Sequence, residues 1–289
     1  MSARWRLAVS TLGAVEESLA DVAALLARHG IDAVELRTAD DAPVHVGLTA
    51  RERAEVRATF ADAGVGVLTV ASRVKVASPD PGTTASLRRH LELTADLGGR
   101  YVRVFPGAPA APVAPDELPP VADVEAADTR AAEVLAATAA QAADLGVGVL
   151  VETHDSHPRG RDVARVLDRV ADHPSVGAIW DLLHPWRVGE ALEESADHLL
   201  PYLLDDRGYV QIKDVPSRQD TTPVLQGAGA LPLDPALALL AGRGYRGPLS
   251  LEWERHWRRD AAPLADAVSA AVTAVAAAPP PHEAPTTRR

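Results

Sequence analysis

Residues 148–183 read GVLVETHDSHPRGRDVARVLDRVADHPSVGAIWDLL. This stretch begins with a short aliphatic run that ends in Glu152 and closes on a similar run that contains Asp181. Between the two runs, apolar residues recur at the i, i+3, i+4, i+7 spacing of a helix, namely Val163, Val166, Leu167 and Val170. The stretch therefore predicts a strand, a helix and a second strand that lies parallel to the first.

The same alternation extends along the whole chain. Strands are predicted at residues 6–11, 32–37, 66–71, 101–106, 148–154, 177–183, 209–214 and 249–254. Several of the intervening helices should end at a glycine placed directly before the next strand, at Gly30, Gly64, Gly98, Gly146 and Gly244. Eight such units in under 300 residues predict an α/β fold, a closed (β/α)8 TIM barrel.

A doubly wound open sheet is the main rival fold, but no glycine-rich phosphate loop follows the first strand. We expect a single barrel domain over residues 1–278 and a Pro-rich, disordered tail over residues 279–289. The Pro-rich stretch at residues 107–120 follows the fourth strand. It is therefore expected to form a long loop, a candidate lid, on the face where such barrels carry their active sites.

Composition narrows the class of protein. The 289 residues carry a formal net charge of −11, which repels phosphate backbones, so nucleic acid is not an expected partner. The chain has no cysteine, and we find neither a signal peptide nor an apolar run of the ~18 residues that a membrane span needs. These features favour a soluble cytoplasmic protein without a membrane partner.

Polar residues stand at equivalent places near the ends of the last four predicted strands. They are Glu152, Asp181, Gln211 and Glu252. Since active sites of such barrels lie at the carboxyl ends of the strands, these side chains should meet, and three converging carboxylates need a cation. Hard oxygen ligands favour Mn²⁺ or Mg²⁺ over Zn²⁺.

Five further residues are candidate substrate contacts: His184, Lys213, His154, Glu35 and Trp186. Lys213 lies two residues after Gln211, on the same side of the strand, and could offset the remaining negative charge. His154 could equally be a packed residue that supports the ligands, and Glu35 could equally be structural, paired with Arg37 or another barrel residue. Packing explains the tryptophan as well as a sugar contact does.

Two arginines near the C-terminus, Arg258 and Arg259, read most simply as a solvated helix start. They would also suit an anionic group of a substrate.

At these residues the chain resembles the sugar phosphate isomerase/epimerase family of xylose isomerase-like TIM barrels. The motifs that carry the resemblance are VELR, VETH, WDLLHP, QIKD, QGAG and LEWE, and the similarity covers residues 5–275. The resemblance implies one divalent metal, Mn²⁺, Mg²⁺, Co²⁺ or Zn²⁺, held by Glu152, Asp181, Gln211 and Glu252. Many members have histidine at the position of Gln211, and the hydroxypyruvate isomerase-like branch has glutamine.

The expected activity is that of a metal-dependent isomerase or epimerase of a sugar, sugar phosphate, cyclitol or related hydroxy-carbonyl compound. Glu152 and Glu252 would exchange a proton next to the carbonyl through a metal-stabilised enediolate. Lyases and dehydratases of the same fold, of the inosose, dehydroshikimate or C-glycoside-cleaving type, would begin with the same step. A non-catalytic sugar-binding barrel or partner subunit is the alternative from another class. Barrels of this kind often form homo-oligomers.

Overall fold

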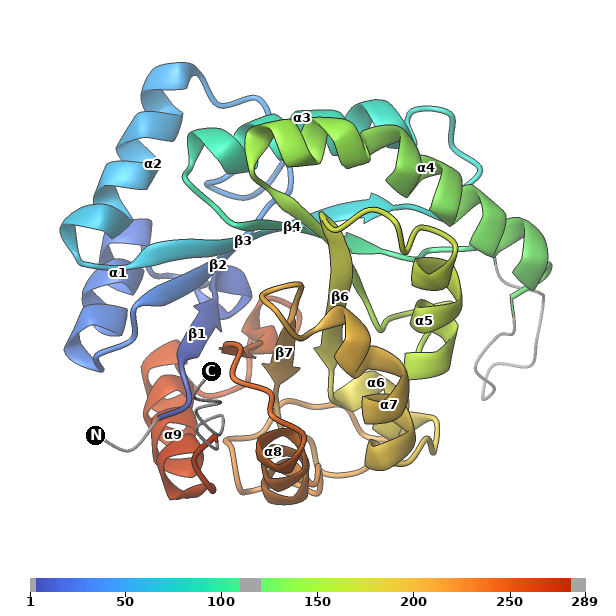
Figure 1. Cartoon of the computed structure of the whole chain (residues 1–289). Helices are drawn as coiled ribbons and strands as arrows, with labels where there is room; N and C mark the ends of the chain where they lie inside the picture. The colour runs from blue at the N-terminus through green and yellow to red at the C-terminus, as the bar shows by residue number, and fades with distance from the viewer. Residues whose placement is uncertain (1–3, 110–120, 282–289) are drawn as a thin grey trace, which may run out of the picture.

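The computed structural model describes residues 4–109 and 121–281, and its strands form a closed parallel barrel in the order β1 to β8 (Figure 1). The strands are β1 Leu7–Ser10, β2 Ala33–Arg37, β3 Gly66–Lys75, β4 Tyr101–Phe105, β5 Gly148–Glu152, β6 Val176–Asp181, β7 Tyr209–Ile212 and β8 Leu249–Leu251. The predicted (β/α)8 barrel is confirmed. β3 is four residues longer than the predicted strand.

Helices surround the barrel on its outside (Figure 1). They are α1 Leu19–Arg28, α2 Ala50–Asp62, α3 Thr83–Asp96, α4 Val124–Leu145, α5 Gly160–Asp168, α6 Leu183–Arg187, α7 Leu192–Leu199, α8 Leu233–Gly242 and α9 Leu264–Ala277. None of the helices in the described residues is both long and apolar enough to cross a membrane. Most of the predicted lid, residues 110–120, and of the predicted tail, residues 282–289, lies outside the described residues.

The helix boundaries follow from local sequence. Ser18 and Thr49 cap α1 and α2, and each is paired with an acidic residue three positions later in a capping box. At the other end, all five predicted cap glycines have positive φ. Gly146 shows the reason most clearly, because it ends α4 in the left-handed conformation, at φ 66°.

The barrel interior is layered, because alternate residues of each strand point inward. One layer is apolar and consists of Ala8, Ala33, Leu68, Tyr101, Leu150, Ile179 and Tyr209. Two residues further along five of these strands, the next inward positions are Glu35, Arg103, Glu152, Asp181 and Gln211, all of them buried. A polar layer with four ionisable side chains therefore lies directly above an apolar floor, towards the carboxyl ends of the strands.

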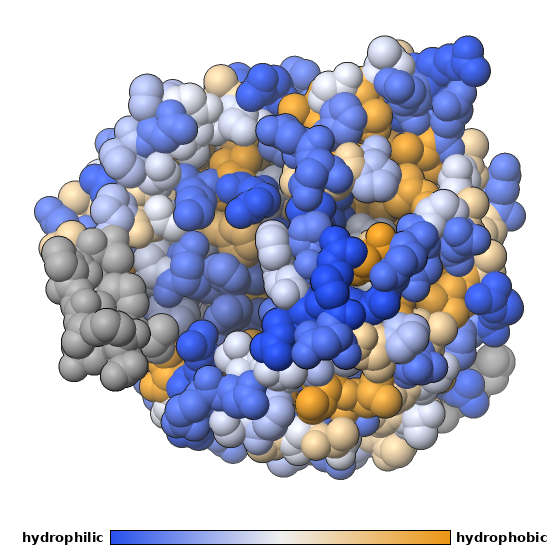
Figure 2. Space-filling model, turned by 180° about the vertical axis from the view of Figure 1, so that it is seen from behind, coloured by the Kyte–Doolittle hydropathy of each residue, from blue (hydrophilic) through white to orange (hydrophobic). Residues whose placement is uncertain are grey.

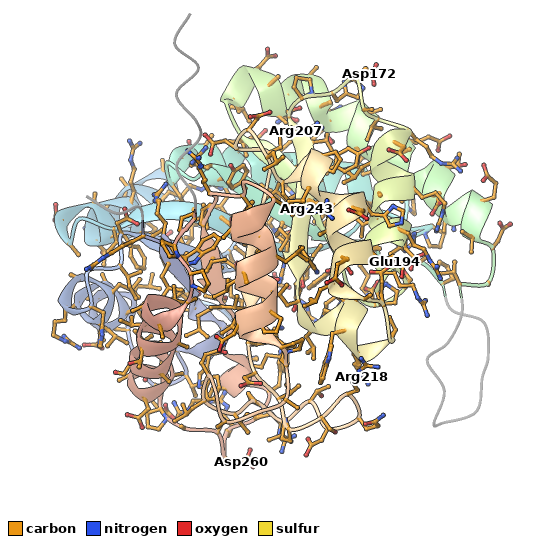
Figure 3. All side chains as sticks on the ribbon, turned by 60° about the horizontal axis from the view of Figure 1, so that its bottom comes forward. Asp172, Glu194, Arg207, Arg218, Arg243 and Asp260 are labelled. Carbon is orange, nitrogen blue, oxygen red and sulfur yellow. The ribbon has the colours of Figure 1, made fainter. Side chains whose placement is uncertain are left out.

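On the face drawn in Figure 2, hydrophobic residues are scattered and form no single large patch. The same face has a hollow that is bordered mostly by hydrophilic residues. Ion pairs tie neighbouring helices together on the outside. Arg243 at the end of α8 lies 2.8 Å from Asp197 of α7, and Arg161 of α5 lies 3.4 Å from Glu194 of α7 (Figure 3).

Asp214, the last residue of the QIKD motif, fastens the loop that follows β7. Its carboxylate accepts hydrogen bonds from the backbone N–H groups of Val215 and Gly227 at 2.9 Å, Gly229 at 2.9 Å and Leu231 at 3.2 Å. The side chain is 2% exposed. Its role is therefore structural: it holds the QGAG segment against the barrel.

Replacing this carboxylate should destabilise the fold. Asp214→Ala leaves four backbone N–H groups without their acceptor, so we expect a loss of about 3 kcal/mol or more in the free energy of unfolding, measured by urea denaturation. Asp172→Ala is the control, because Asp172 is 83% exposed and should change stability by less than about 0.5 kcal/mol (Figure 3). Equal effects of the two substitutions would contradict this account.

Candidate active site

Three carboxylates meet inside the carboxyl end of the barrel. Glu152, Asp181 and Glu252 each offer an oxygen, and these oxygens all lie within 4.8 Å of one another. Glu152 and Asp181 are 0% exposed and Glu252 is 5% exposed. Gln211 is level with Asp181, its partner in the parallel register of β6 and β7. The structure thus brings together the four residues that the sequence predicted as metal ligands.

Lys213 joins this group from the position just after β7. Its ammonium lies 2.8 Å from Asp181 Oδ2 and 2.9 Å from Glu254 Oε1, and it also forms an ion pair with Glu252. Burial disfavours the charged amine, but these three carboxylates outweigh it and raise the pKa of Lys213 well above its usual value. The three carboxylates therefore favour the charged form of Lys213.

Arg103, on β4, is a second buried cation, which the sequence analysis missed. Its Nη1 donates to Glu152 Oε2 at 3.1 Å and to Glu252 Oε1 at 3.3 Å, and its Nη2 donates to the carbonyl of Ser72 at 3.1 Å. The guanidinium also lies over the ring of Phe105 at 4.2 Å. The signal in the sequence was the alternation in YVRVF, which places Arg103 on the inward side with Tyr101 and Phe105.

The two glutamates that share Arg103 have different environments. Burial raises the pKa of Glu152 well above its usual value, although Arg103 opposes the shift. Burial also opposes ionisation of Glu252, but there Lys213 and Arg103 together outweigh it and the pKa is lowered. Both groups are buried in a medium where charge interactions are strong.

Glu35 lies behind Gln211 and holds its amide. Gln211 Nε2 donates to Glu35 Oε2 at 3.2 Å, and the same carboxylate accepts from the hydroxyls of Tyr209 at 2.6 Å and Ser250 at 3.2 Å. Burial raises the pKa of Glu35, and the charge of Glu252 adds to the shift. Glu35 is 0% exposed and is not paired with Arg37, which instead binds Asp41 at 3.0 Å. This packing favours the structural role that the sequence left open over contact with a substrate.

The donor set fits a divalent cation. Glu152 Oε1 and Gln211 Oε1 are buried and have no hydrogen-bond partner among the described residues. Because the nitrogen of the Gln211 amide is engaged by Glu35, its oxygen is the atom left free. Buried polar atoms without partners are costly, and carboxylate and amide oxygens are the ligands that hard divalent cations prefer.

Two histidines flank the carboxylates on one side. The rings of His154 and His184 are 4.5 Å apart, and His184 Nε2 lies 3.4 Å from Asp181 Oδ2. Burial lowers the pKa of His154, and His184 adds to the shift. Together with Glu152, these imidazoles form a second group that could hold a metal ion, with the softer ligands that suit Zn²⁺. The donor atoms alone therefore do not decide between the predicted Mn²⁺ or Mg²⁺ and Zn²⁺.

A pocket of about 270 Å³ opens beside the carboxylates and is lined by Arg37, Arg73, Arg103, His154, Glu252 and Trp257, among others. Trp257 is 55% exposed, whereas Trp180 and Trp253 are packed in the core. Trp186, a predicted substrate contact, does not line this pocket; the guanidinium of Arg218 lies over its ring at 5.3 Å. Arg258 and Arg259 are also absent from its lining, and Arg258 donates to Thr222 Oγ1 at 2.7 Å.

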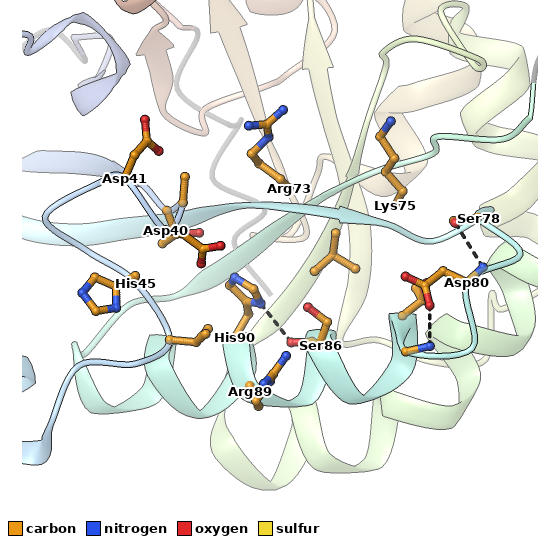
Figure 4. A pocket seen from close by; sticks show the side chains of 16 residues that line it. Asp40, Asp41, His45, Arg73, Lys75, Ser78, Asp80, Ser86, Arg89 and His90 are labelled. Atoms are coloured by element: carbon orange, nitrogen blue, oxygen red, sulfur yellow. Dashed lines mark hydrogen bonds between the residues drawn. The ribbon is translucent and has the colours of Figure 1, made fainter.

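A second, larger hollow of about 680 Å³ lies between β3, α3 and the segment after β2. Figure 4 shows Arg73 and Lys75 projecting from β3 away from α3, whereas Ser86 and His90 rise from that helix. Arg73 lines both hollows.

The fold and this site together define a (β/α)8 barrel with a carboxylate-rich centre suited to a divalent cation. The chain belongs to the xylose isomerase-like TIM barrel family, whose model matches residues 23–274. No curated protein sequence matches the chain.

Solved structures share the fold at low sequence identity. The IOLI protein with a bound zinc atom superposes with a TM-score of 0.72 at 19% identity, over 94% of this chain and 98% of that chain. D-Psicose 3-epimerase, solved in the presence of D-fructose, gives 0.70 at 16% identity, over 94% and 97%. The 3-keto-D-glucoside 4-epimerase of E. coli gives 0.67 at 18% identity, over 86% and 92%.

The contact between Glu35 and Gln211 can be tested through metal binding. Glu35→Gln replaces an acceptor by a group that can also donate, so the amide of Gln211 loses its fixed orientation. We expect the affinity for Mn²⁺, measured by isothermal titration calorimetry, to fall by about 10- to 100-fold.

Glu190→Gln is the matched control. Glu190 is also a buried carboxylate, 6% exposed, and it accepts from Gly160 N–H and from the hydroxyl of Ser195, away from the metal ligands. This variant should lose stability and keep its Mn²⁺ affinity. An unchanged affinity in Glu35→Gln would show that Glu35 does not position Gln211.

Proposed function

We propose that this protein is a divalent-metal-dependent isomerase or epimerase of small sugar-like hydroxy-carbonyl compounds. The observation that carries the proposal is the meeting of Glu152, Asp181 and Glu252 within 4.8 Å at the barrel mouth, beside a pocket of about 270 Å³. Family membership supports it, and so does the shared fold with structures named as sugar epimerases.

Four residues would hold the cation: Glu152, Asp181, Gln211 and Glu252. Mn²⁺ or Mg²⁺ suits this all-oxygen set best, with Co²⁺ or Zn²⁺ as alternatives. When bound, such an ion supplies a Lewis acid for a carbonyl oxygen.

Glu152 and Glu252 are the proposed acid and base. They reach the site from β5 and from the residue after β8, so they approach a bound carbon atom from different sides of the barrel. One carboxylate would take the proton from the carbon next to the carbonyl, and the other would return a proton to the same or the adjacent carbon. Arg103 touches both carboxylates and would keep them in place through the proton transfer.

Lys213 and His184 are the proposed substrate-positioning residues. Both contact Asp181, and both carry N–H groups suited to substrate oxygens. His154, which lines the pocket, is a third candidate.

β-Elimination of water is a second candidate reaction, favoured by one observation. The rings of His154 and His184 are 4.5 Å apart beside Glu152, and an imidazole placed there could give a proton to a departing hydroxide. Isomerisation and elimination share the first proton abstraction and differ in their products.

Metal dependence is the first prediction of this proposal. Protein purified without chelator should contain close to one equivalent of Mn, Mg, Co or Zn by elemental analysis. A bound ion would give the buried oxygens of Glu152 and Gln211 the partner that they lack. Removal of the metal should lower the melting temperature, and added Mn²⁺ should restore it by mass action. A preparation that has no metal and gains no stability from added metal would refute the enzyme proposal and favour a non-catalytic barrel.

The proton transfer is tested by solvent deuterium wash-in, followed by NMR over a panel of ketoses, inososes and hydroxypyruvate. We expect deuterium at the carbon next to the carbonyl. Glu152→Gln and Glu252→Gln should each slow the exchange by about 100-fold or more, since each removes an acid–base group. The NMR spectrum of the product then separates isomerisation from loss of water.

Glu190→Gln again serves as a control and should exchange at the rate of the unaltered protein. Exchange at an unchanged rate in both site variants would rule out the roles proposed for Glu152 and Glu252.

A further inference from the structure

Two arginines flank an exposed tryptophan at the rim of the pocket. The guanidinium carbons of Arg37 and Arg73 both lie 5.9 Å from the ring centre of Trp257. Trp257 is the one aromatic residue among the large hydrophobic side chains exposed in the described residues. The ring attracts both guanidinium groups and so helps to hold them at the rim of the pocket.

Of the three arginines that line the pocket, Arg73 is the one that forms no salt bridge with a described carboxylate. Arg37 is paired with Asp41 at 3.0 Å, and Arg103 is paired with Glu152 and Glu252. Within residues 4–109 and 121–281, no carboxylate lies within the 4.0 Å of a salt bridge from Arg73, although the chain has 40 acidic residues and a net charge of −11.

The pocket offers a second unsatisfied donor at its inner end. Arg103 is 6% exposed, and its Nε is buried with no hydrogen-bond partner among the described residues. Arg103 and Arg73 both line the pocket. A buried, unpaired N–H donor of Arg103 and the exposed guanidinium of Arg73 therefore belong to residues that border the same small cavity.

Lys213 and Arg103 offset part of the charge of the buried carboxylates, and a divalent cation would offset more of it. Glu252 and Glu254, the carboxylates that line the pocket, are both bound to Lys213, which reduces their repulsion of an anion. The positive charge of Arg73 then remains at the mouth, where an anionic ligand would meet it.

We propose that the substrate carries an oxyanion group, a carboxylate or a phosphate, which binds to Arg73 beside Trp257 while the carbonyl end lies at Glu152 and Glu252. This inference rests on the proposed function and narrows its substrate class from sugar-like hydroxy-carbonyl compounds in general to acidic ones. The pocket, at about 270 Å³, is close to the lower end of the ~300–1,000 Å³ that small-molecule sites span, so the substrate is small.

The test is calorimetric titration of the full-length, metal-loaded protein with two probes, inorganic phosphate and succinate. We expect at least one probe to bind saturably. Arg73→Ala should weaken that binding by about tenfold or more, as expected for a lost charge-assisted hydrogen bond, whereas Arg73→Lys should stay within about threefold of the unaltered protein. Tighter binding of phosphate indicates a phosphorylated substrate, and tighter binding of succinate indicates a carboxylate.

Two controls separate this site from other sources of anion binding. Arg28→Ala removes the same charge from the exposed last turn of α1 and should leave the affinity unchanged. Titration after the metal has been removed and the chelator dialysed away should still detect the anion, because Arg73 does not depend on the metal.

The inference is overturned if neither probe binds, if Arg73→Ala binds as tightly as the unaltered protein, or if binding disappears with the metal alone. Its failure is distinct from failure of the proposed function. Deuterium exchange without anion binding would refute only the acidic substrate. Anion binding through Arg73 in a protein that contains no metal and shows no exchange would refute only the isomerase proposal.

Discussion

Three carboxylates buried within 4.8 Å of one another can remain ionised only if positive charge lies among them. The chain supplies part of that charge itself, through Lys213 between Asp181 and Glu252 and through Arg103 between Glu152 and Glu252. The oxygens that these cations leave unpaired are those best placed for a metal ion. This balance of charge accounts for the placement of a lysine just after β7 and of an arginine on β4.

The barrel provides such a site because of its layers. The apolar floor, with Leu150, Ile179 and Tyr209, excludes water from below, so the charges above it interact in a low dielectric. On five of the strands, a step of two residues leads from that floor to the polar layer. A one-residue slip of a strand would therefore turn a ligand outward and an aliphatic residue inward.

Much of the fold was predictable because its signals are local. The eight strands and the glycines that end the helices are visible within windows of about ten residues. The four candidate ligands were predictable because they stand at equivalent strand ends, and the structure brings them together. Their binding of a metal remains a prediction.

The parts of the site that sequence analysis missed depend on long-range contacts. Arg103 is 49 residues from Glu152 and 149 from Glu252, and a lone arginine in an apolar strand gives no indication of such partners. Glu35 was recognised as a candidate, but its partners Tyr209, Gln211 and Ser250 are 174 or more residues away. The contact between Arg73 and Trp257 could not be predicted for the same reason, because it joins the end of β3 to the segment after β8.

The hold of Glu35 on the amide of Gln211 would also suit a histidine at this position. Glu35 requires only an N–H donor from its neighbour. An imidazole could donate one ring N–H to Glu35 and present its other nitrogen to a metal ion, as the glutamine is proposed to present its oxygen. Exchange between glutamine and histidine would then change the hardness of the ligand set and leave the supporting carboxylate untouched. A barrel built in this way can change its metal preference by a single substitution on β7.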